Sequence, residues 1–592
     1  MSPPKLLQKT AYLQFAPKEH SCPNCKGRLL IRKTRSRKIV LLGLGAVQTE
    51  EVHSYCPACP QLPDFKSKEL PQLVAPGAKF GYDVMVYIGY AMFQRYRTVD
   101  EILLELSARQ IEISSSEVRV QSRRFVLYLA QAHAECQKEL KGLLKQQGGY
   151  ILHLDGTCDG ASSHLVSAMD GVSELVLMNI KVNSEKAESI VPMLNNIRNT
   201  YGTPLAVVSD MGKAFLNAVK LVFKSLPHYI CHFHFLRDTG KDLLEKDYDC
   251  IRKELRNNGI CALLRRRSRE LKAKMGENIN SVDSMIKELE QGVLPAACTN
   301  ELPTSLAYAL LEWALAGKKQ GDGYGFPFDL PLVNFYDRLK KLYQALLLMR
   351  KDHLIDEGAK KSLVLKLTKD LQAVVENQVL QTIIDAIHEK KQIFDQLRQA
   401  LRIDQPGDIQ GLNDDGLNEN ISAIEEDVTT FCEELQQRPD FTSDGPYGSM
   451  LSQIKKYWAM IFADPIKVHT TRGDIVICPN RTNNIMERLF RSLNREHRRQ
   501  TGMNSMRRRL DSMIGDTPLV KNLENKVYQK ILLDGSPTLE ERFARIDSRQ
   551  IKNAMKERKM EAGSTLPGLR KIFRSLNWPL EVVKSWAQAK VS

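Results

Sequence analysis

Asp155 and Asp210 are carboxylates that each follow a short apolar run typical of a buried strand. Asp155 closes the run Gly149-Tyr-Ile-Leu-His-Leu, and Gly156 after it permits a tight turn, so we expect the strand to end at the carboxylate. Asp210 closes the run Pro204-Leu-Ala-Val-Val-Ser. An acid in such a place costs free energy unless a cation or hydrogen-bond donors meet it. The pattern therefore favours a cation or hydrogen-bond donors at each carboxylate, with turn capping as the alternative.

Four cysteines form two pairs with the spacing of metal-binding knuckles. The pairs are Cys22-Pro-Asn-Cys25 and Cys56-Pro-Ala-Cys59. Two knuckles complete a tetrahedral thiolate site, so the spacing predicts a structural Zn²⁺. The 30 residues between the pairs, 26 to 55, suit the hairpins of a zinc ribbon. His20 and His53 are close enough in sequence to replace one ligand, and reduced cysteines without metal are the alternative.

A dense basic run lies between the two cysteine pairs. Its members are Arg32, Lys33, Arg35, Arg37 and Lys38. Clustered basic side chains neutralise phosphates, so we expect this run to bind DNA.

The two aspartates lie within a segment whose elements can be ordered from the sequence. Strands are expected at 149–155, 164–169, 175–182, 204–210 and 228–233, and helices at 185–200 and 213–223. The dipeptide Asp170-Gly171 predicts a hairpin turn, whereas the helical crossovers demand parallel pairing. Two neighbouring strands of this mixed sheet would then bring Asp155 and Asp210 to one edge.

This order of elements, with His153-Leu-Asp155-Gly-Thr157 and Val208-Ser-Asp210, resembles the ribonuclease-H-like catalytic core of DDE transposases. The similarity is to transposases of bacterial insertion sequences and to their Mutator-like relatives. It covers residues 150–237 and 465–502 well, and the N-terminal layout more loosely. In that family a glutamate on a helix far downstream completes the site. The segment Arg481-Thr-Asn-Asn-Ile-Met-Glu487 is similar to this third motif.

The resemblance implies Mg²⁺- or Mn²⁺-dependent phosphoryl transfer on double-stranded DNA. Asp155 would bridge two ions, Asp210 would bind one of them and Glu487 the other. Water would cut a strand at a transposon end, and the freed 3′-hydroxyl would attack target DNA. Three carboxylates from separate elements are what a two-metal site of this kind needs.

The expected fifth strand carries Cys231-His-Phe-His234. In a continuous strand these two side chains face opposite ways and cannot share a metal ion. A similar Cys or Asp, two residues and a His recur here in the related transposases, so the resemblance places Cys231 and His234 near the active site. A hydrogen-bonded structural role for His234 is the alternative.

The helix that carries Glu487 is expected to run to about residue 500. Its apolar residues gather on one side, and Glu487, Arg491 and Arg498 share the other. Residues 481 to 510 hold nine Arg against two Glu, a net of 9 − 2 = +7, which fits a phosphate-rich substrate. We therefore expect Arg491 and Arg498 to contact the DNA backbone. The alternative is an ordinary surface pair between Glu487 and Arg491.

Three helices are expected ahead of this core, at 82–96, 98–106 and 114–133. Thr98 and Glu101 form a capping box that begins the second. The third carries three arginines and, with the second, suggests a DNA-binding helix-turn-helix; helices that only pack are the alternative. These arginines are Arg119, Arg123 and Arg124.

The whole chain has 592 residues and room for three or four domains. Lys and Arg exceed Asp and Glu by 85 − 70 = 15, which favours a polyanionic partner. The sequence has no apolar stretch that would span a membrane and no signal-peptide core. Its twelve cysteines are expected to be reduced unless they hold metal. We expect a cytoplasmic, nucleoid-associated protein.

The predicted fold is multidomain α/β. A zinc ribbon (1–70) and a helix-turn-helix-like domain (71–145) precede a ribonuclease-H-like mixed sheet (146–238). An all-α insertion (239–470) interrupts this core before the third-carboxylate helix (471–515), and a helical tail (516–592) follows. Within the insertion we expect helices at 261–275, 282–291, 304–316, 332–350 and 360–389, and loops at 317–328 and 404–420.

The predicted function is that of a DDE transposase, acting on terminal inverted repeats and target DNA as a homodimer or larger assembly. A retired transposase that only regulates DNA, or a nuclease that cuts without joining, are the alternatives.

Overall fold

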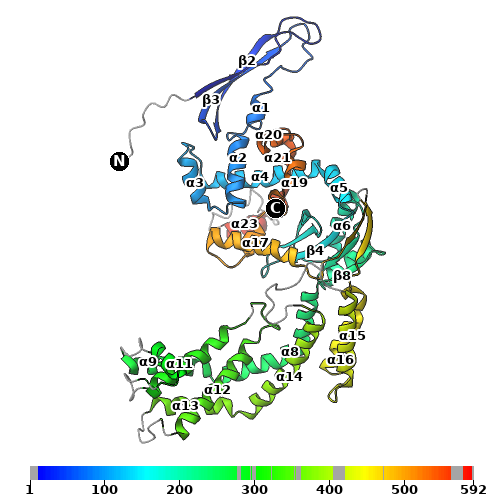
Figure 1. Cartoon of the computed structure of the whole chain (residues 1–592). Coiled ribbons are helices and arrows are strands. Elements are labelled where there is room, and N and C mark those ends of the chain that lie inside the picture. Colours follow the sequence, from blue (N-terminus) through cyan, green and yellow to red (C-terminus); the bar gives the residue numbers. More distant parts are fainter. Residues whose placement is uncertain are drawn as a thin grey trace. The chain divides into compact units, whose positions relative to one another are not determined.

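The computed structural model describes residues 11–276, 282–293, 295, 302–321, 323–352, 354, 362–403, 421–470, 473–561 and 578–589. The chain divides into two compact units. The first combines Met1–His228 with Pro465–Ser592, and the second is Tyr229–Asp464. The described chain contains many helices and three sheets (Figure 1), so the predicted mixed α/β class is confirmed.

The N-terminal sheet has three strands in the order β1-β3-β2. They are β1 (Ala11–Phe15), β2 (Leu30–Leu41) and β3 (Gly45–Tyr55). The long β2 and β3 form an antiparallel hairpin, and β1 pairs with β3 in parallel. On β2 only the end near Ile39 is buried, because Ile39, Leu41 and Val47 form a small core with neighbouring residues. On β3 the opposite end, Val52 to Ser54, is buried as well.

A helical layer follows, in which the second, third and fourth helices begin and end close to the predicted positions. They are α1 (Leu70–Leu73), α2 (Tyr82–Phe93), α3 (Val99–Ser107), α4 (Ser115–Glu135) and α5 (Gln137–Gln146). Thr98 and Glu101 make the predicted capping box. Every residue from Phe125 to Leu129 of α4 is buried, so the middle of this helix lies inside the protein, whereas Arg119 and Arg123 before it and Ala134 and Glu135 after it are exposed.

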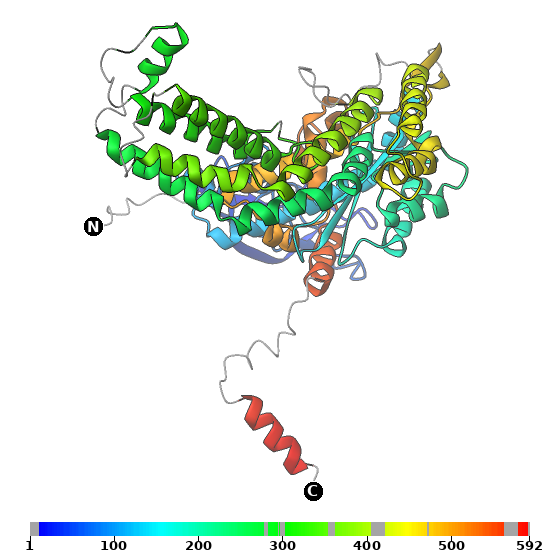
Figure 2. The ribbon, with the colours of Figure 1, turned by 90° about the horizontal axis from the view of Figure 1, so that it is seen from below.

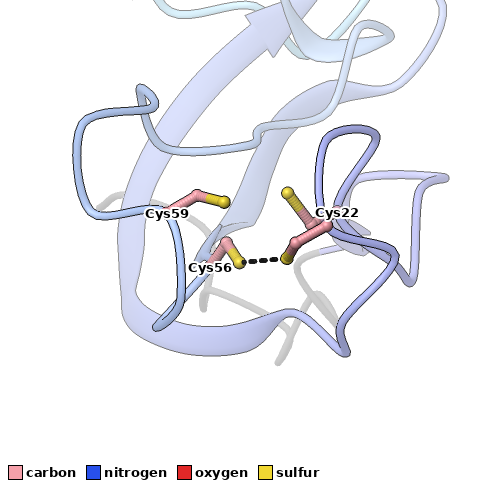
Figure 3. Close-up of side chains that lie close together, drawn as sticks. Cys22, Cys56 and Cys59 are labelled. Carbon is pink, nitrogen blue, oxygen red and sulfur yellow. Dashed lines mark hydrogen bonds between the residues drawn. The ribbon is translucent and has the colours of Figure 1, made fainter.

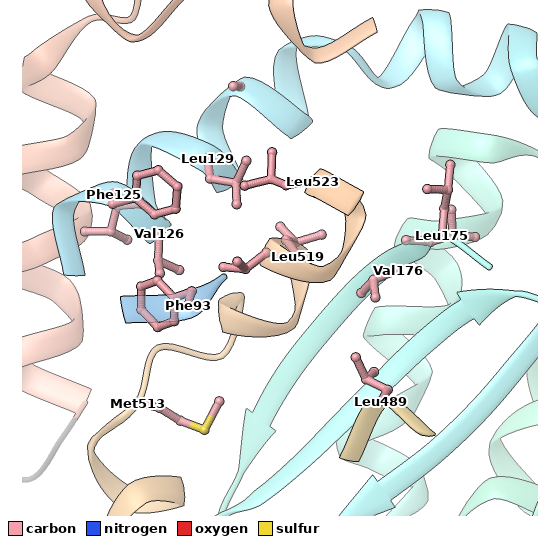
Figure 4. Close-up of a cluster of buried hydrophobic side chains, with 14 of the residues drawn as sticks. Phe93, Phe125, Val126, Leu129, Leu175, Val176, Leu489, Met513, Leu519 and Leu523 are labelled. Atoms are coloured by element: carbon pink, nitrogen blue, oxygen red, sulfur yellow. The ribbon is translucent and has the colours of Figure 1, made fainter. Parts of the chain in front are cut away.

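The C-terminal elements pack against this layer. The packed elements are η4 (Thr517–Glu524), α19 (Lys526–Leu533), α20 (Leu539–Ala544) and α21 (Ser548–Glu561). Helix α23 (Trp578–Ala589) follows after a gap in the description, and its Leu580 and Val583 are exposed. Figure 4 shows Leu129 of α4 beside Leu523 of η4. One continuous hydrophobic core joins these segments to the central sheet.

The central sheet has five strands in the order β6-β5-β4-β7-β8. They are β4 (Ile151–Thr157), β5 (His164–Asp170), β6 (Val176–Val182), β7 (Ala206–Ser209) and β8 (His228–Ile230). Strand β4 pairs antiparallel with β5 and parallel with β7. The predicted meander followed by crossovers is therefore the observed connection. Helices α6 (Ala187–Tyr201) and α7 (Lys213–Val222) supply the crossovers.

Two predicted strand ends were wrong. Strand β4 does not stop at Asp155, because Gly156 and Thr157 continue to pair with β5. The fifth strand stops at Ile230 instead of residue 233, and Cys231 is the N-cap of helix α8 (His232–Asn257). In both places an adjacent element decides the boundary: a partner strand extends β4, and a helix start ends β8.

The chain returns to the first unit through a hairpin and two helices. These are β9 (Ile466–Thr470), β10 (Gly473–Ile477), α17 (Asn484–Thr501) and α18 (Arg507–Ser512). The buried side of α17 includes Ile485, Met486, Leu489 and Leu493, which is the predicted apolar side.

The second unit is built from helices. After α8 come α9 (Ile260–Met275), α10 (Val282–Glu290), α11 (Leu302–Ala316), the 3₁₀ turn η3 (Gly317–Lys319) and α12 (Pro331–Lys351). Then follow α13 (Leu363–Val375), α14 (Gln378–Ala400), α15 (Ile421–Gln437) and α16 (Pro446–Ile461). Helices α8 and α14 lie side by side (Figure 1, Figure 2).

The single helix predicted at 360–389 was wrong. Asn377 caps a new helix with its side chain, so α13 ends at Val375 and α14 begins at Gln378. The predicted loop at 404–420 lies outside the described residues. Among the residues that are described, we found no helix with the length and apolar character needed to cross a membrane.

Candidate functional site

Asp155 and Asp210 follow directly on paired positions of two adjacent parallel strands. The register pairs Leu154 of β4 with Ser209 of β7, and this is the last pair between the two strands. The next residue on each strand is an aspartate. Because parallel strands run in the same direction, both carboxylates stand at one edge of the β4–β7 ladder.

Backbone N–H groups hold both carboxylates in place. Gly156 N–H donates to Asp155 Oδ1 at 2.8 Å, and Gly212 N–H donates to Asp210 Oδ1 at 3.0 Å. Each bond joins an acid to a residue one or two positions later in the chain. The local backbone therefore fixes the side-chain rotamer of each aspartate. The second oxygen of each acid is then oriented as well.

Glu487 reaches this region from the first turn of α17. Its side chain is about a quarter exposed, and Arg491 Nη2 lies 3.9 Å from Glu487 Oε2. The N-cap residue of α17, Asn483, is hydrogen-bonded to the backbone of β4 through Leu154 O. This bond joins a strand and a helix across 329 residues of sequence, next to Asp155. We call Asp155, Asp210 and Glu487 the carboxylate group.

The pKa of Asp155 depends on both of the other acids. Its side chain is buried, and burial raises the pKa of Asp155 well above the usual range. The negative charges of Asp210 and Glu487 raise the pKa further, whereas the Gly156 N–H opposes the shift. Like charges gathered around a buried acid favour a proton or a cation at this position.

Glu185 is a fourth acid at this place, and sequence reasoning missed it. It lies between β6 and α6, and its charge also raises the pKa of Asp155. Burial and the Asp210 charge raise the pKa of Glu185 in turn, and His164 Nδ1 lies 3.9 Å from its Oε2. A Cβ at position 156 would stand 2.6 Å from Glu185 Oε2, so Gly156 leaves room for this carboxylate.

Glu496, the other acid on α17, is a structural residue. Its side chain is buried and accepts a hydrogen bond from Arg509 Nη2 at 2.7 Å. Burial raises the pKa of Glu496 to about 7, although the Arg509 charge acts in the opposite direction. It occupies the apolar side of the helix, away from the exposed arginines, as its position in the sequence predicts.

The four cysteines of the paired knuckles converge on one point (Figure 3). Their sulfur atoms all lie within 4.8 Å of one another, and Cys25 Sγ and Cys56 Sγ are 3.3 Å apart. A tetrahedral Zn²⁺ site with Zn–S bonds of about 2.3 Å places its sulfurs about 3.8 Å apart. The predicted gathering of the four thiols is therefore confirmed, and the set fits a structural metal ion. We call Cys22, Cys25, Cys56 and Cys59 the cysteine cluster.

The two histidines considered as substitute ligands are not part of this cluster. Among the described residues, the cluster that meets the 4.8 Å criterion contains four cysteines and neither His20 nor His53. His53 is buried, with its Nε2 3.0 Å from Glu51 Oε2 and its Nδ1 3.8 Å from Asp64 Oδ2. The His53 ring therefore lies between the side chains of Glu51 and Asp64.

Within the described residues, no second group of three or more His, Cys, Asp or Glu meets the same criterion. The oxygens of the carboxylate group are therefore more widely spaced than the sulfurs of the cysteine cluster.

Cys231 and His234 belong to the start of α8 in the second unit. On a helix, residues three apart share a face, so the objection that applied to a strand no longer holds. His234 is buried, and burial lowers its pKa to about 3, so its ring is neutral. The nearness of these two residues to the carboxylate group stays a prediction.

The predicted DNA-binding residues lie mainly at the surface. On β2, Arg32, Lys33, Arg35 and Lys38 are exposed, whereas Arg37 is partly buried and donates to Ala78 O at 3.0 Å. On α4, Arg119 and Arg123 are exposed, and Arg124 is partly buried.

Helices α17 and α18 present the densest set of exposed arginines next to the carboxylate group. They are Arg488, Arg491, Arg495, Arg498, Arg499, Arg507 and Arg508. Arg491 and Arg498 are both in this set, as their places on the polar side of the helix predict. Arg488 pairs with Glu174 at 2.6 Å.

Comparison of the chain with protein-family models and with curated proteins found no match.

Proposed function

We propose that this chain is a DDE transposase, which cuts DNA at transposon ends and joins the freed 3′-hydroxyl to target DNA. The five-stranded sheet with its crossovers and α17 would be a ribonuclease-H-like core, and the second unit would be the insertion within it. The resemblance of the Asp155, Asp210 and Glu487 motifs to those of such enzymes is the starting point.

One observation carries the proposal. The β4–β7 register ends at Leu154 and Ser209, so the two motif aspartates are the next residues on both strands. The acid from the third motif, Glu487, is close enough to Asp155 to raise its pKa. The sequence motifs named these three acids, which span 332 residues (487 − 155). In the fold, the charges of Asp210 and Glu487 both act on Asp155.

The donor set suits Mg²⁺ or Mn²⁺. These ions prefer carboxylate oxygens, and Asp155, Asp210 and Glu487 would hold them. Bound there, two such ions would activate the attacking oxygen and stabilise the leaving oxygen of a phosphoryl transfer. The buried Asp155 carboxylate, surrounded by like charges, is the ligand with most to gain from a cation.

The residues of the chain would orient the reacting strands. In the first step a water oxygen attacks the phosphorus at a transposon end, and the bond from that phosphorus to the 3′ oxygen breaks. In the second, the new 3′-hydroxyl loses its proton, attacks a target phosphorus and displaces a target 3′ oxygen. The exposed arginines of α17 and α18, Arg491 and Arg498 among them, would neutralise the phosphates on either side.

The N-terminal region would bind DNA away from the chemistry. The cysteine cluster would hold a structural Zn²⁺ in a zinc ribbon, with the exposed basic residues of β2 along one edge of its hairpin. The exposed arginines at the start of α4 would add phosphate contacts. Positive side chains in these places support non-specific affinity and do not by themselves specify a sequence.

The test is strand transfer with purified protein, Mg²⁺ and DNA that carries the terminal repeats flanking the gene. We expect joined products with the wild type, and none with Asp155→Asn or Asp210→Asn, while both variants still bind the end DNA. Wild-type cleavage without joined products would assign a nuclease. End binding without metal-dependent cleavage would assign a DNA-binding regulator.

A further inference from the structure

Asn483 is the N-cap residue of α17 but does not cap it. Within α17, all of which the structure describes, the Asn483 side chain makes no capping hydrogen bond. Asparagine is favoured at this position because its side-chain oxygen accepts from a backbone N–H of the first turn. Asn377 and Asn525 do this for α14 and α19. The different behaviour of Asn483 calls for a separate explanation.

The Asn483 amide instead joins the helix to strand β4. Its Nδ2 donates to Leu154 O at 2.8 Å, and its Oδ1 lies 2.8 Å from His153 Nδ1. Because Nδ2 is used as the donor, Oδ1 must be the acceptor, so His153 carries a proton on Nδ1. Both Asn483 and His153 are fully buried. Two hydrogen bonds in a buried setting fix the amide in one orientation.

The strand side of this contact is equally constrained. Side chains two apart on a strand share a face, so His153 and Asp155 project from the same face of β4. A Cβ at Gly171 would lie 2.7 Å from the His153 ring, which shows how closely the β5–β6 turn packs against that ring. The ring is thus held between Gly171 and Asn483.

The helix side leads directly to the third acid. The backbone carbonyl of Asn483 accepts hydrogen bonds from Met486 N–H at 3.0 Å and from Glu487 N–H at 3.1 Å. Asn483 therefore makes two links. Its side chain binds the carbonyl of Leu154, next to Asp155, and its backbone carbonyl binds the N–H of Glu487.

We propose that Asn483 is a positioning residue, which sets Glu487 against Asp155 so that both can hold one cation site. The inference rests on the proposed cation-binding role of the carboxylate group. It explains why the amide forgoes its usual capping bond, since departures from local preference are expected where a site must be assembled. Residues that orient metal ligands typically change metal affinity by about 10- to 100-fold when altered.

Asn483→Ser is the sharpest variant. Serine is also a preferred N-cap, so α17 can remain capped, but its side chain is too short to make both bonds to β4. The matched control is Asn522→Ser. Asn522 is a buried amide of η4 that binds β6 in the same way, by accepting from Val176 N–H and donating to Val176 O, both at 2.8 Å.

The readout is Mn²⁺ affinity of the full chain without DNA, from the free Mn²⁺ signal in electron paramagnetic resonance, at a temperature where circular dichroism shows each variant folded. We expect Asn483→Ser to raise the half-saturating Mn²⁺ concentration at least 10-fold and Asn522→Ser to change it less than 2-fold. Both should lower the melting temperature. Adding Asn483→Ser to Glu487→Gln should cause no further loss of Mn²⁺ affinity, because the Glu487 carboxylate that Asn483 positions is already absent.

Equal Mn²⁺ affinity for the Asn483 and Asn522 variants would overturn the positioning role and leave the proposed function intact. Wild-type protein that binds Mn²⁺ no better than Asp155→Asn would overturn both. Should Asn483→Ser not fold, His153→Gln removes the other end of the same bridge. An unchanged Mn²⁺ affinity in that variant would count against the proposal.

Discussion

The cysteine cluster and the carboxylate group are both candidate metal sites, but they are assembled in opposite ways. The cluster comes from two local knuckles on either side of one hairpin, and its sulfurs already lie within 4.8 Å of one another. The carboxylate group takes its members from β4, the end of β7 and α17, and its oxygens stay farther apart. The cluster is therefore set by local spacing in the sequence, whereas the carboxylate group depends on tertiary packing.

The two sites therefore differ in how they affect the stability of the protein. A structural Zn²⁺ at the cysteine cluster would stabilise a local fold that buries few apolar side chains of its own. Where the ligands repel one another, the rest of the fold must hold them near each other and is destabilised by doing so. The carboxylate group is therefore supported by fixed backbone donors at Gly156 and Gly212 and by the Asn483 bridge.

Removal of metal from the cysteine cluster should have the largest effect. We expect Cys22→Ser or a strong chelator to unfold the N-terminal sheet, since structural Zn²⁺ binding is worth about 10–16 kcal/mol in small domains. Elemental analysis should find one Zn²⁺ in the wild-type chain. Cys158→Ser, an exposed cysteine outside the cluster, is the control. A zinc-free protein with the N-terminal sheet still folded would contradict the assignment.

Glu487→Gln should have the next largest effect, on chemistry and not on folding. We expect strand joining to fall by roughly 1,000-fold, which equals about 4 kcal/mol of transition-state stabilisation. End binding should be kept or become tighter, because a negative charge near phosphate is removed. Glu496→Gln on the same helix is the control and should still join strands. The reverse pattern would make Glu496 the third acid.

Asp155→Asn should stabilise the protein when no divalent cation is present. The pKa of Asp155 is raised above that of the unfolded chain, so its contribution to stability is full at low pH and is lost as the pH rises through the folded pKa. The variant should therefore melt about 2–4 °C higher at pH 8 for each kcal/mol of repulsion removed, and show little advantage near pH 4. Thermal melts at both pH values measure this.

Asp170→Asn provides the contrast. Asp170 is also buried, but it accepts hydrogen bonds from Ile151 N–H, Val172 N–H and Ser173 N–H. An amide can replace only part of this acceptor set, so the variant should melt lower than the wild type. If Asp155→Asn also melted lower at every pH, repulsion within the carboxylate group would not be a destabilising force.

Arg491→Ala should have the smallest effect. Its side chain is 67% exposed, so stability should hardly change. DNA binding should weaken about equally for all sequences, and the slope of log K against log salt should flatten by about 0.9, the value for one phosphate contact. Arg549→Ala, an exposed arginine paired with Asp547, is the control. A salt slope identical in both variants would remove Arg491 from the DNA-binding surface.

The sequence predicted best what depends on residues close together in the chain. The cysteine spacing predicted the cluster, and the apolar runs and the Asp170-Gly171 turn predicted the meander of the central sheet. It also predicted that the two aspartates follow neighbouring strands, because the element order permits few topologies.

What depends on tertiary partners could not be predicted. Strand β4 extends past Asp155 because β5 lies opposite, and no residue type marks that. Glu185 follows an unremarkable strand and joins the acids only through the folding of the β6–α6 connection. Asn483 looks like an ordinary helix cap, and its bond to Leu154 O appears only when α17 and β4 meet.

The place of α17 in the chain also sets when the acids can first meet. Glu487 is 332 residues (487 − 155) behind Asp155, so a ribosome adding about 5–20 residues per second needs roughly 17–66 s to reach it. Until then the nascent chain holds at most two of the three acids, and β4 lacks its partner Asn483. A prematurely terminated chain would carry the basic residues of β2 and α4 but an incomplete carboxylate group. Under the proposed function, such a chain would bind DNA without cutting it.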